Sequence, residues 1–227
     1  MSVRPVYIPS EDHENLVISK NIDFVWFPGF SVSQKRKSIL SLHSSIKKEI
    51  SLKKILEIST KSPEKIGVQA SAFNLQIEYN SLNSSIESIY QGSKVFKNGG
   101  PYSDLYNKKS IYAKKDMRLK TSGDLICFDF LGEKWELNED FYSWLYLLAL
   151  TQNNIVKSKL LNYEAFTDIE FNPKKSFNCQ AYSAALYVSF IRKNISLKNI
   201  YYKDKFIQLL PNKIFKSQLN IFNQLDL

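Results

Sequence analysis

Apolar residues recur along this chain with two different periods, and each period predicts a different kind of element. In the segment that begins at Ser31, apolar side chains at positions 39, 42, 46 and 50 lie three or four residues apart, as on one face of an amphipathic helix. The run 22–27 is apolar and aromatic and stops at Pro28-Gly29, which is typical of a strand. The same reasoning predicts strands at 3–8, 76–79 and 125–130, helices at 111–119, 140–150, 157–163 and 178–191, and a loop or strand that presents acids at 165–173.

The expected helices outnumber the expected strands, and the strands are short. The pattern therefore predicts an α+β fold in which helices dominate. A length of 227 residues fits one domain with an added lobe. A content of 44% hydrophobic and 14% aromatic residues is enough for a sizeable core and excludes a disordered chain.

The segment 84–97 combines an apolar face with a stripe of polar side chains. We predict one helix over this segment, capped by one of the two serines that open it and ended by the sequence Asn-Gly-Gly-Pro, which cannot continue it. On this helix Glu87, Gln91 and Lys94 are spaced i, i+4 and i+7, so that an acid, an amide and an amine would align. On spacing alone, a solvated face that carries a Glu and a Lys is the simpler interpretation.

The chain carries a net charge of +9 and has a pI of about 9.3, a balance that favours acidic partners. Nucleic acid is the first candidate and an anionic membrane surface the second, although a lysine-rich composition explains the charge equally well. Lys35 and Arg36 at the start of a predicted helix, and Lys114 and Lys115 further along, are candidate contacts to nucleic-acid phosphates. A solvated helix end is the alternative interpretation of each cluster.

The sequence gives no support for a metal site or a membrane segment. Cys127 and Cys179 form no CxxC motif, and the two histidines, His13 and His43, do not indicate a zinc site, so we expect no metal and no cofactor. The amino terminus lacks the layout of a signal peptide, and no apolar run approaches about 18 residues. These features predict a cytoplasmic protein with reduced thiols and no membrane partner.

The side chains that remain for chemistry are carboxylates, one amine, amides and aromatic rings. Neither histidine lies near a Ser or Cys motif, and the glycines form neither GxGxxG nor a phosphate-binding loop. Carboxylates such as Glu87 and Asp168 suit the cleavage of an N-glycosidic bond, because they stabilise an oxocarbenium-like transition state and activate water. A desolvated Lys94 would instead attack an opened sugar as an amine nucleophile. The residues alone leave these two mechanisms open.

The segment 85–96, Ser-Ile-Glu-Ser-Ile-Tyr-Gln-Gly-Ser-Lys-Val-Phe, resembles the (S/T)VEhaFQaxKf helix of the NADAR family. The upstream segment 70–75 resembles the LSNFyp motif of that family, with Ala72 where an asparagine is usual. Trp135 stands where the family carries a tryptophan ahead of a helix, and 166–178 resembles its closing D-fWG…gxNxLG segment. There, Ile-Glu-Phe replaces the usual aromatic–glycine pair, and the start of the following helix also differs.

Longer strings resemble one branch of this family, which is associated with DNA ADP-ribosyltransferase toxins of the DarT type. These strings are 26–35, 92–96 with 98–102, and 165–174. The resemblance covers nearly the whole chain, including N-terminal residues that minimal family members lack. It therefore implies an added N-terminal lobe at 1–60 that packs on a NADAR-like glycohydrolase domain at 61–227.

The resemblance implies an antitoxin-type hydrolase that removes ADP-ribose from modified guanine in single-stranded DNA. Its partners would be ADP-ribosylated DNA, or ADP-ribose and ADP-ribosylguanosine nucleotides, and the cognate toxin. Glu87 would be the catalytic carboxylate, Lys94 an amine nucleophile or a phosphate ligand, and Asp168 a further catalytic group at the sugar or base. The implied substrate-binding residues are Ser71, Phe73, Gln91, Tyr102, Trp135 and Asn178.

Two other functions stay open at this point. Some NADAR members are linked to the hydrolysis of phosphorylated intermediates of riboflavin synthesis, although the added lobe counts against that substrate. A non-enzymatic antitoxin would instead bind nucleic acid or the toxin through the basic clusters at 35–37 and 114–115.

Overall fold

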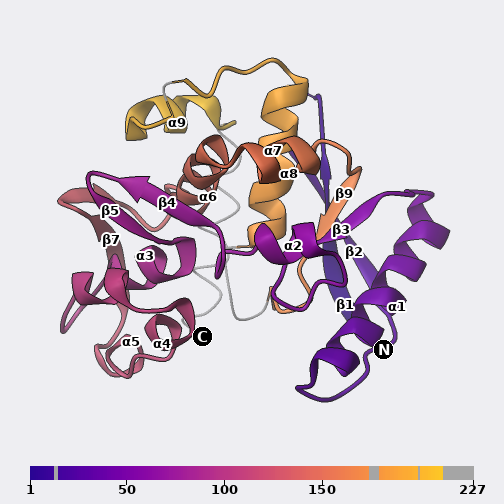
Figure 1. Cartoon of the computed structure of the whole chain (residues 1–227), viewed down its shortest axis with the longest axis horizontal. Coiled ribbons are helices and arrows are strands. Elements are labelled where there is room, and N and C mark those ends of the chain that lie inside the picture. Colours follow the sequence, from indigo (N-terminus) through magenta and orange to yellow (C-terminus); the bar gives the residue numbers. More distant parts are fainter. Residues whose placement is uncertain (13–14, 174–178, 199, 212–227) are drawn as a thin grey trace. The chain divides into compact units, whose positions relative to one another are not determined.

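The computed structural model of the chain describes residues 1–12, 15–173, 179–198 and 200–211 (Figure 1). These residues form helices and three separate sheets, which confirms the predicted mixture of helices and strands. The chain divides into two compact units, Met1–Ser71 with Asn153–Asn199 and Ala72–Gln152 with Ile200–Leu227. The helical majority stays a prediction. The division into 1–60 and 61–227 also stays a prediction, because a compact unit is not by itself a segment that folds alone.

The first unit is built on a four-stranded sheet. Its strands are β1 (Ser2–Pro9), β2 (Val17–Phe24), β3 (Ile55–Glu57) and β9 (Ala165–Thr167). Their order in the sheet is β2-β1-β9-β3, and only the β3–β9 pair is parallel. This parallel pair joins segments far apart in the sequence and places Glu57 opposite Thr167.

Helix α1 (Val32–Ile50) is the amphipathic helix that the apolar spacing predicts, and Figure 1 shows it in indigo beside β2. Ser31 caps it by accepting a hydrogen bond from the Gln34 N–H, and Ser51 ends it in the left-handed conformation with φ 60°. Its buried face and the facing strands share an apolar cluster of Val6, Ile22, Phe24, Ile39, Leu42, Ile46, Ile55, Ala165 and Ile169. The other helices of this unit are α2 (Lys65–Gln69), α7 (Asn154–Leu160) and α8 (Gln180–Arg192).

Strand β2 ends at Phe24, before the predicted end of the strand at position 27. The backbone N–H groups of Val25 and Phe27 donate to the hydroxyls of Ser41 and Ser38 on α1, at 3.1 and 3.0 Å. Backbone donors that bind the helix are not available to a neighbouring strand, so the helix determines where the strand stops.

The second unit carries a hairpin and a three-stranded antiparallel sheet. Its strands are β4 (Gln76–Tyr79), β5 (Leu82–Ser85), β6 (Lys94–Phe96), β7 (Leu125–Phe130) and β8 (Glu133–Trp135). Its helices are α3 (Ile86–Gly92), the 3-10 helix η1 (Ser103–Asn107), α4 (Ser110–Lys114), α5 (Arg118–Thr121), α6 (Phe141–Gln152) and α9 (Lys203–Leu209). The pairs are β4 with β5, and β7 with both β6 and β8.

Helix α6 lies in the aromatic core of the second unit. Trp144 is completely buried, and its indole Nε1–H donates to the carbonyl of Ile200 at 2.7 Å. The rings of Trp144, Trp135 and Phe141 pack within 5.0–6.0 Å of one another, between centroids. Among the helices of the described residues, none is long and apolar enough to cross a membrane.

The prediction of one helix over 84–97 is wrong in its second half. Helix α3 ends at Gly92, and Lys94 lies on β6, where it pairs with β7. A Cβ at Gly92 would lie 2.6 Å from the ring of Tyr106, and the N–H of Tyr102 donates to the Gly92 carbonyl at 2.7 Å. The chain that returns after β6 therefore packs directly on Gly92, at a position where only a glycine fits.

The basic helix predicted at 111–119 is divided into α4 and α5. Between them, the Asp116 carboxylate accepts hydrogen bonds from the Arg118 backbone N–H at 3.1 Å and from its Nε at 2.8 Å. Such local side-chain bonds compete with helix continuation. The sequence pattern also does not predict β8, which Trp135 ends.

Candidate active site

Glu87 lies in the first turn of α3, and its carboxylate is buried, with a side chain that is 7% exposed. Ser85 caps the helix by accepting the Ser88 N–H at 3.2 Å, as the sequence predicts. The Glu87 N–H donates to the Ala72 carbonyl at 2.9 Å, which fixes this first turn against the preceding segment. A carboxylate in such a position needs polar or charged partners.

Two side chains meet the same oxygen of Glu87. Gln91 Nε2 donates to Oε1 at 3.0 Å, one helical turn away, as the i, i+4 spacing predicts. The ammonium of Lys114, at the end of α4, lies 3.6 Å from Oε1. The sequence predicts Lys114 only as a nucleic-acid contact, and nothing in the local pattern indicates that it reaches Glu87.

Lys94 belongs to this group although it is not on the helix. Its Nζ lies 4.9 Å from the centroid of the Tyr90 ring, so the ammonium faces an aromatic surface. Burial lowers the pKa of the Lys94 amine to about 8; the Glu87 carboxylate acts in the opposite direction, and the Lys114 ammonium in the same direction as burial. At pH 7, about one amine in ten would then be uncharged, which is far more than for an ordinary lysine.

Hydroxyl groups fix the position of α4 and of Phe73 relative to α3. Ser85 Oγ and Ser110 Oγ lie 2.7 Å apart, and Ser110 Oγ donates to the Phe73 carbonyl at 2.8 Å. Ser88 Oγ donates to the Lys108 carbonyl at 2.8 Å. The half-buried Phe73 ring lies 5.0 Å from the Lys114 ammonium, measured to the ring centroid. Helix α3, helix α4 and the segment that carries Phe73 thus converge on Glu87.

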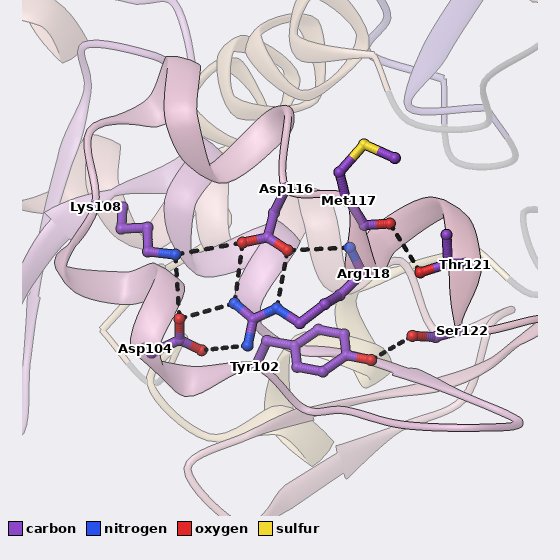
Figure 2. A network of polar contacts seen from close by, with 8 residues as sticks. All are labelled: Tyr102, Asp104, Lys108, Asp116, Met117, Arg118, Thr121 and Ser122. Carbon is purple, nitrogen blue, oxygen red and sulfur yellow. Dashed lines mark hydrogen bonds and ion pairs between the residues drawn. The ribbon is translucent and has the colours of Figure 1, made fainter.

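A network of charged side chains anchors the segment that carries Lys114 (Figure 2). The Arg118 guanidinium binds Asp104 through two nitrogens, at 2.8 and 3.1 Å, and also binds Asp116. Lys108 reaches both carboxylates, at 3.2 and 3.3 Å. Hydrogen bonds from Arg118 are the first cause that lowers the pKa of both the Asp104 and the Asp116 carboxyl groups.

Tyr102 and Trp135, both predicted to bind substrate, have many contacts within the protein. The Tyr102 hydroxyl bonds to Ser122, and the Arg118 guanidinium lies 4.4 Å from the centroid of the ring (Figure 2). Trp135 is 0% exposed within the aromatic core. A substrate would reach the Trp135 ring only if neighbouring side chains moved, so both contacts stay predictions.

Asp168 lies in the first unit, directly after β9, and is 7% exposed. Its Oδ1 accepts the N–H groups of Glu170 and Phe171 at 3.0 and 3.2 Å, and its Oδ2 accepts Gln180 Nε2 at 3.0 Å. These bonds close a turn around the carboxylate. The catalytic role of Asp168 stays a prediction, and the turn is a structural role that it performs in any case.

Sequence reasoning missed Glu57, a buried acid in the apolar run that contains β3. Its carboxyl group accepts the Ile169 N–H at 2.8 Å and the Thr167 hydroxyl at 2.7 Å, and so binds both neighbours of Asp168. Burial, and then repulsion by Asp168, raise the pKa of the Glu57 carboxyl to about 8. A single acid among apolar neighbours was the one available signal.

The remaining predicted residues are distributed over the first unit and the helix end of α4. Lys35 pairs with Glu170 at 3.0 Å, and an Arg36 guanidinium nitrogen lies 3.4 Å from the Ser62 carbonyl. Ser71 is completely buried and donates to the Val68 carbonyl at 2.8 Å. Lys115 is exposed, and Asn178 lies outside the described residues.

A pocket of about 510 Å³ lies elsewhere in the second unit, at the turn end of the β4–β5 hairpin. Its lining includes three carboxylates, Glu78, Glu133 and Asp204, and one ammonium, Lys203. An excess of carboxylates repels phosphates. We therefore place the candidate site at Glu87, where two lysines lie beside one carboxylate, and not in this pocket.

The described residues contain no group of three or more His, Cys, Asp or Glu side chains that could hold a metal ion. Comparison with protein-family models gives a match over residues 2–219, nearly the whole chain, to a family described as DarT1-associated NADAR antitoxin. None of the curated proteins compared with the chain matches it.

Proposed function

The chain belongs to the DarT1-associated NADAR antitoxin family, and we propose that it acts as an antitoxin by hydrolysing the N-glycosidic bond between ADP-ribose and guanine in DNA. Membership supports the antitoxin role, and the specific reaction is our proposal. Its main support is the position of Glu87: a buried carboxylate that has an amide and two lysine ammonium groups as neighbours.

In the proposed reaction, Glu87 acts on the anomeric carbon of the ribose that is bound to guanine. As the C–N bond lengthens, positive charge develops on the sugar, and a carboxylate at low exposure stabilises this charge strongly. A water molecule attacks the anomeric carbon and gives up a proton to Glu87, while the guanine nitrogen takes a proton from solvent water and leaves. Gln91 holds Glu87 Oε1 in place during this step.

Lys94 has two possible roles in this proposal, and they need opposite protonation states. As a nucleophile, the uncharged amine adds to the anomeric carbon of the ring-opened sugar, and the guanine leaves with a proton from the amine. Water then hydrolyses the resulting imine, which releases ADP-ribose and regenerates the amine. As a phosphate ligand, the ammonium binds the diphosphate of ADP-ribose. A pKa of about 8 makes both states accessible near neutral pH.

Basic side chains of each unit are proposed to bind the DNA strand. Lys35, Arg36 and Lys115 would contact backbone phosphates, which supply most of the sequence-independent affinity for nucleic acid. Lys35 would exchange its ion pair with Glu170 for a phosphate on binding. Asp168 would contact the sugar or base, while its turn keeps the carboxylate in a fixed orientation.

The Glu87→Gln variant tests this function, because it keeps the shape of the side chain and removes the charge. We expect at least about a hundredfold slower release of ADP-ribose from ADP-ribosylated single-stranded DNA, with binding of that DNA retained. The exposed Glu78 of the same unit provides a matched control, and Glu78→Gln should release ADP-ribose at the wild-type rate.

Undiminished release by Glu87→Gln would refute the mechanism. Phosphorylated riboflavin-pathway intermediates should be assayed with the same preparation, because hydrolysis of those compounds alone would change the substrate and keep the site. Toxin neutralisation by Glu87→Gln at the wild-type level would favour a binding antitoxin over an enzyme.

A further inference from the structure

Lys114 covers two groups that the substrate is expected to contact. Its ammonium lies 3.6 Å from the Glu87 carboxylate and 5.0 Å from the centroid of the Phe73 ring. Glu87 is the proposed catalytic carboxylate, and Phe73 offers an aromatic face on which a base would stack. A substrate that reaches both groups must therefore displace this ammonium.

The two partners of the ion pair differ strongly in exposure. The Lys114 side chain is 55% exposed, whereas the Glu87 side chain is 7% exposed. Ion pairs with an exposed partner contribute little to stability, about 0–1 kcal/mol, because water screens the charge and the long side chain loses freedom. At 3.6 Å the ammonium is too distant from Glu87 Oε1 for a good hydrogen bond, whereas a substrate phosphate can approach it and accept a charge-assisted hydrogen bond. Exchange of Glu87 for a phosphate is therefore favourable for Lys114.

Only the side chain of Lys114 needs to move in this exchange. The backbone of α4 is fixed at its start by Ser110 and Lys108, and just after its end by the Asp116–Arg118–Asp104 network (Figure 2). The four-carbon stem of a lysine allows the ammonium to swing through several ångströms on such a fixed base.

From these observations we propose that Lys114 gates the Glu87 site: its ammonium holds Glu87 and covers Phe73 until a phosphate of the substrate takes it over. The inference rests on the proposed function, since it assumes that the substrate carries phosphates. The phosphate belongs either to the diphosphate of the ADP-ribosyl group or to the DNA backbone. In either case the exchange uncovers the Phe73 ring and leaves Glu87 with Gln91 and Lys94.

The charge of Lys114 has an electrostatic consequence for Lys94, which lies near the same carboxylate. The Lys114 ammonium favours the uncharged form of the Lys94 amine, and the Glu87 carboxylate favours the charged form. Removing the charge of Lys114 should therefore raise the pKa of Lys94, and removing the charge of Glu87 should lower it. Variants of Lys114 and of Glu87 should therefore shift the pKa of Lys94 in opposite directions.

The test compares Lys114→Met with Lys120→Met in the full-length protein. Methionine keeps an apolar side chain against Phe73 and removes the charge, and Lys120 is an exposed lysine on α5 that has no proposed part in binding. Two probes separate the sources of the phosphate: free ADP-ribose, and an unmodified single-stranded oligonucleotide, each titrated by calorimetry. The pKa of Lys94 is followed by its rate of reaction with an amine-acylating reagent between pH 6 and 10, read by peptide mass spectrometry.

We expect Lys114→Met to weaken the binding of one of the two probes roughly tenfold, and Lys120→Met to weaken the binding of that probe less than twofold. A loss of affinity for ADP-ribose identifies the diphosphate as the group that binds Lys114. A loss of affinity for the oligonucleotide identifies the backbone phosphate. Lys114→Arg should keep the affinity within about threefold, and the reaction of Lys94 should move to higher pH in Lys114→Met only.

Equal losses of affinity in Lys114→Met and Lys120→Met, or no loss of affinity for either probe, would overturn the gate. An unchanged pH dependence of Lys94 in Lys114→Met would do so as well. A wild-type protein that binds neither probe would overturn the proposed function together with the gate. Normal probe binding with undiminished ADP-ribose release by Glu87→Gln would overturn the function and leave the gate to be judged by Lys114→Met.

Discussion

Glu57 and Glu87 are both buried glutamates, one in each unit, but their surroundings are of opposite kinds. Glu57 accepts a backbone N–H and a hydroxyl, and the nearest charge that influences it is another carboxylate, Asp168. Glu87 has an amide and a lysine on one oxygen and a second lysine nearby. The first carboxyl group is surrounded by fixed neutral donors and the second by cations, one of them exposed.

This difference separates a structural acid from one suited to catalysis. Neutral backbone and hydroxyl donors hold Glu57 rigidly, and burial with Asp168 nearby favours its protonated form. Two lysines lie beside Glu87, and the exposed Lys114 can leave without disturbing the backbone. A group that must stabilise positive charge in a reaction needs the second environment, and a group that holds a turn needs the first.

The largest expected contrast between the two acids is in stability. Glu57→Ala removes the acceptor of two buried donors, the Ile169 N–H and the Thr167 hydroxyl, and leaves a cavity. We expect a loss of about 3 kcal/mol in the free energy of unfolding. Glu87→Ala loses a pair with an exposed lysine and leaves the Gln91 amide without its acceptor, so it should cost less, about 1.5 kcal/mol. Urea denaturation of both variants measures the difference.

A milder substitution serves as the control for this contrast. In Glu57→Gln, the amide can still accept the Ile169 N–H and can donate to the Thr167 hydroxyl, so we expect nearly wild-type stability. If Glu57→Gln were as destabilising as Glu57→Ala, the charge of Glu57 rather than its hydrogen bonds would hold the turn. Equal losses for Glu57→Ala and Glu87→Ala would remove the distinction between the two acids.

The pH dependence of Lys94 gives the next largest effect and decides between its two roles. Because the pKa is lowered to about 8, the uncharged amine increases about tenfold per pH unit below pH 8 and then levels off. A nucleophilic Lys94 predicts that ADP-ribose release follows this increase. A phosphate-binding Lys94 predicts the reverse sign: affinity for ADP-ribose is constant below pH 8 and falls above it.

Lys94→Arg separates the two roles independently of pH, because a guanidinium stays charged throughout this range. Release and ADP-ribose affinity should be measured from pH 6 to 9 for both proteins. If Lys94→Arg keeps its affinity for ADP-ribose but no longer releases ADP-ribose from DNA, Lys94 is the nucleophile. If Lys94→Arg still releases ADP-ribose, Lys94 is a phosphate ligand. If neither quantity of the wild-type protein titrates near pH 8, Lys94 has neither role.

The sequence predicted those features that depend on neighbours along the chain. The face of α1, the Ser85 cap and the contact between Glu87 and Gln91 all follow from local spacing. The end of α3 did not, because Gly92 is packed by Tyr102 and Tyr106 from a later segment. Local periodicity continues through such a position, while the fold stops the helix there.

The composition of both acidic sites also depends on distant segments. Glu57 meets Thr167 through a parallel strand pair, across more than a hundred residues of chain, and Lys114 reaches Glu87 from a separate short helix. No spacing rule connects such positions in a single sequence. The family resemblance implies roles for Glu87 and Lys94, whereas the sequence pattern placed Lys94 on a helix and Lys114 among the candidate nucleic-acid contacts.

The smallest expected effect concerns Ser110, which connects α4 to Phe73. Ser110→Ala removes a hydroxyl that donates to the Phe73 carbonyl and lies 2.7 Å from Ser85 Oγ, so we expect a loss of about 1 kcal/mol in the free energy of unfolding. Because α4 also carries Lys114, the kcat/KM of ADP-ribose release should fall a few-fold, through a higher KM rather than a lower kcat.

Thr121→Ala, which removes an exposed hydroxyl bond to the Met117 carbonyl in α5, is the matched control and should leave KM unchanged. If Ser110→Ala lowered stability and left KM unchanged as well, the hydroxyl would hold the fold without positioning Lys114 at Glu87.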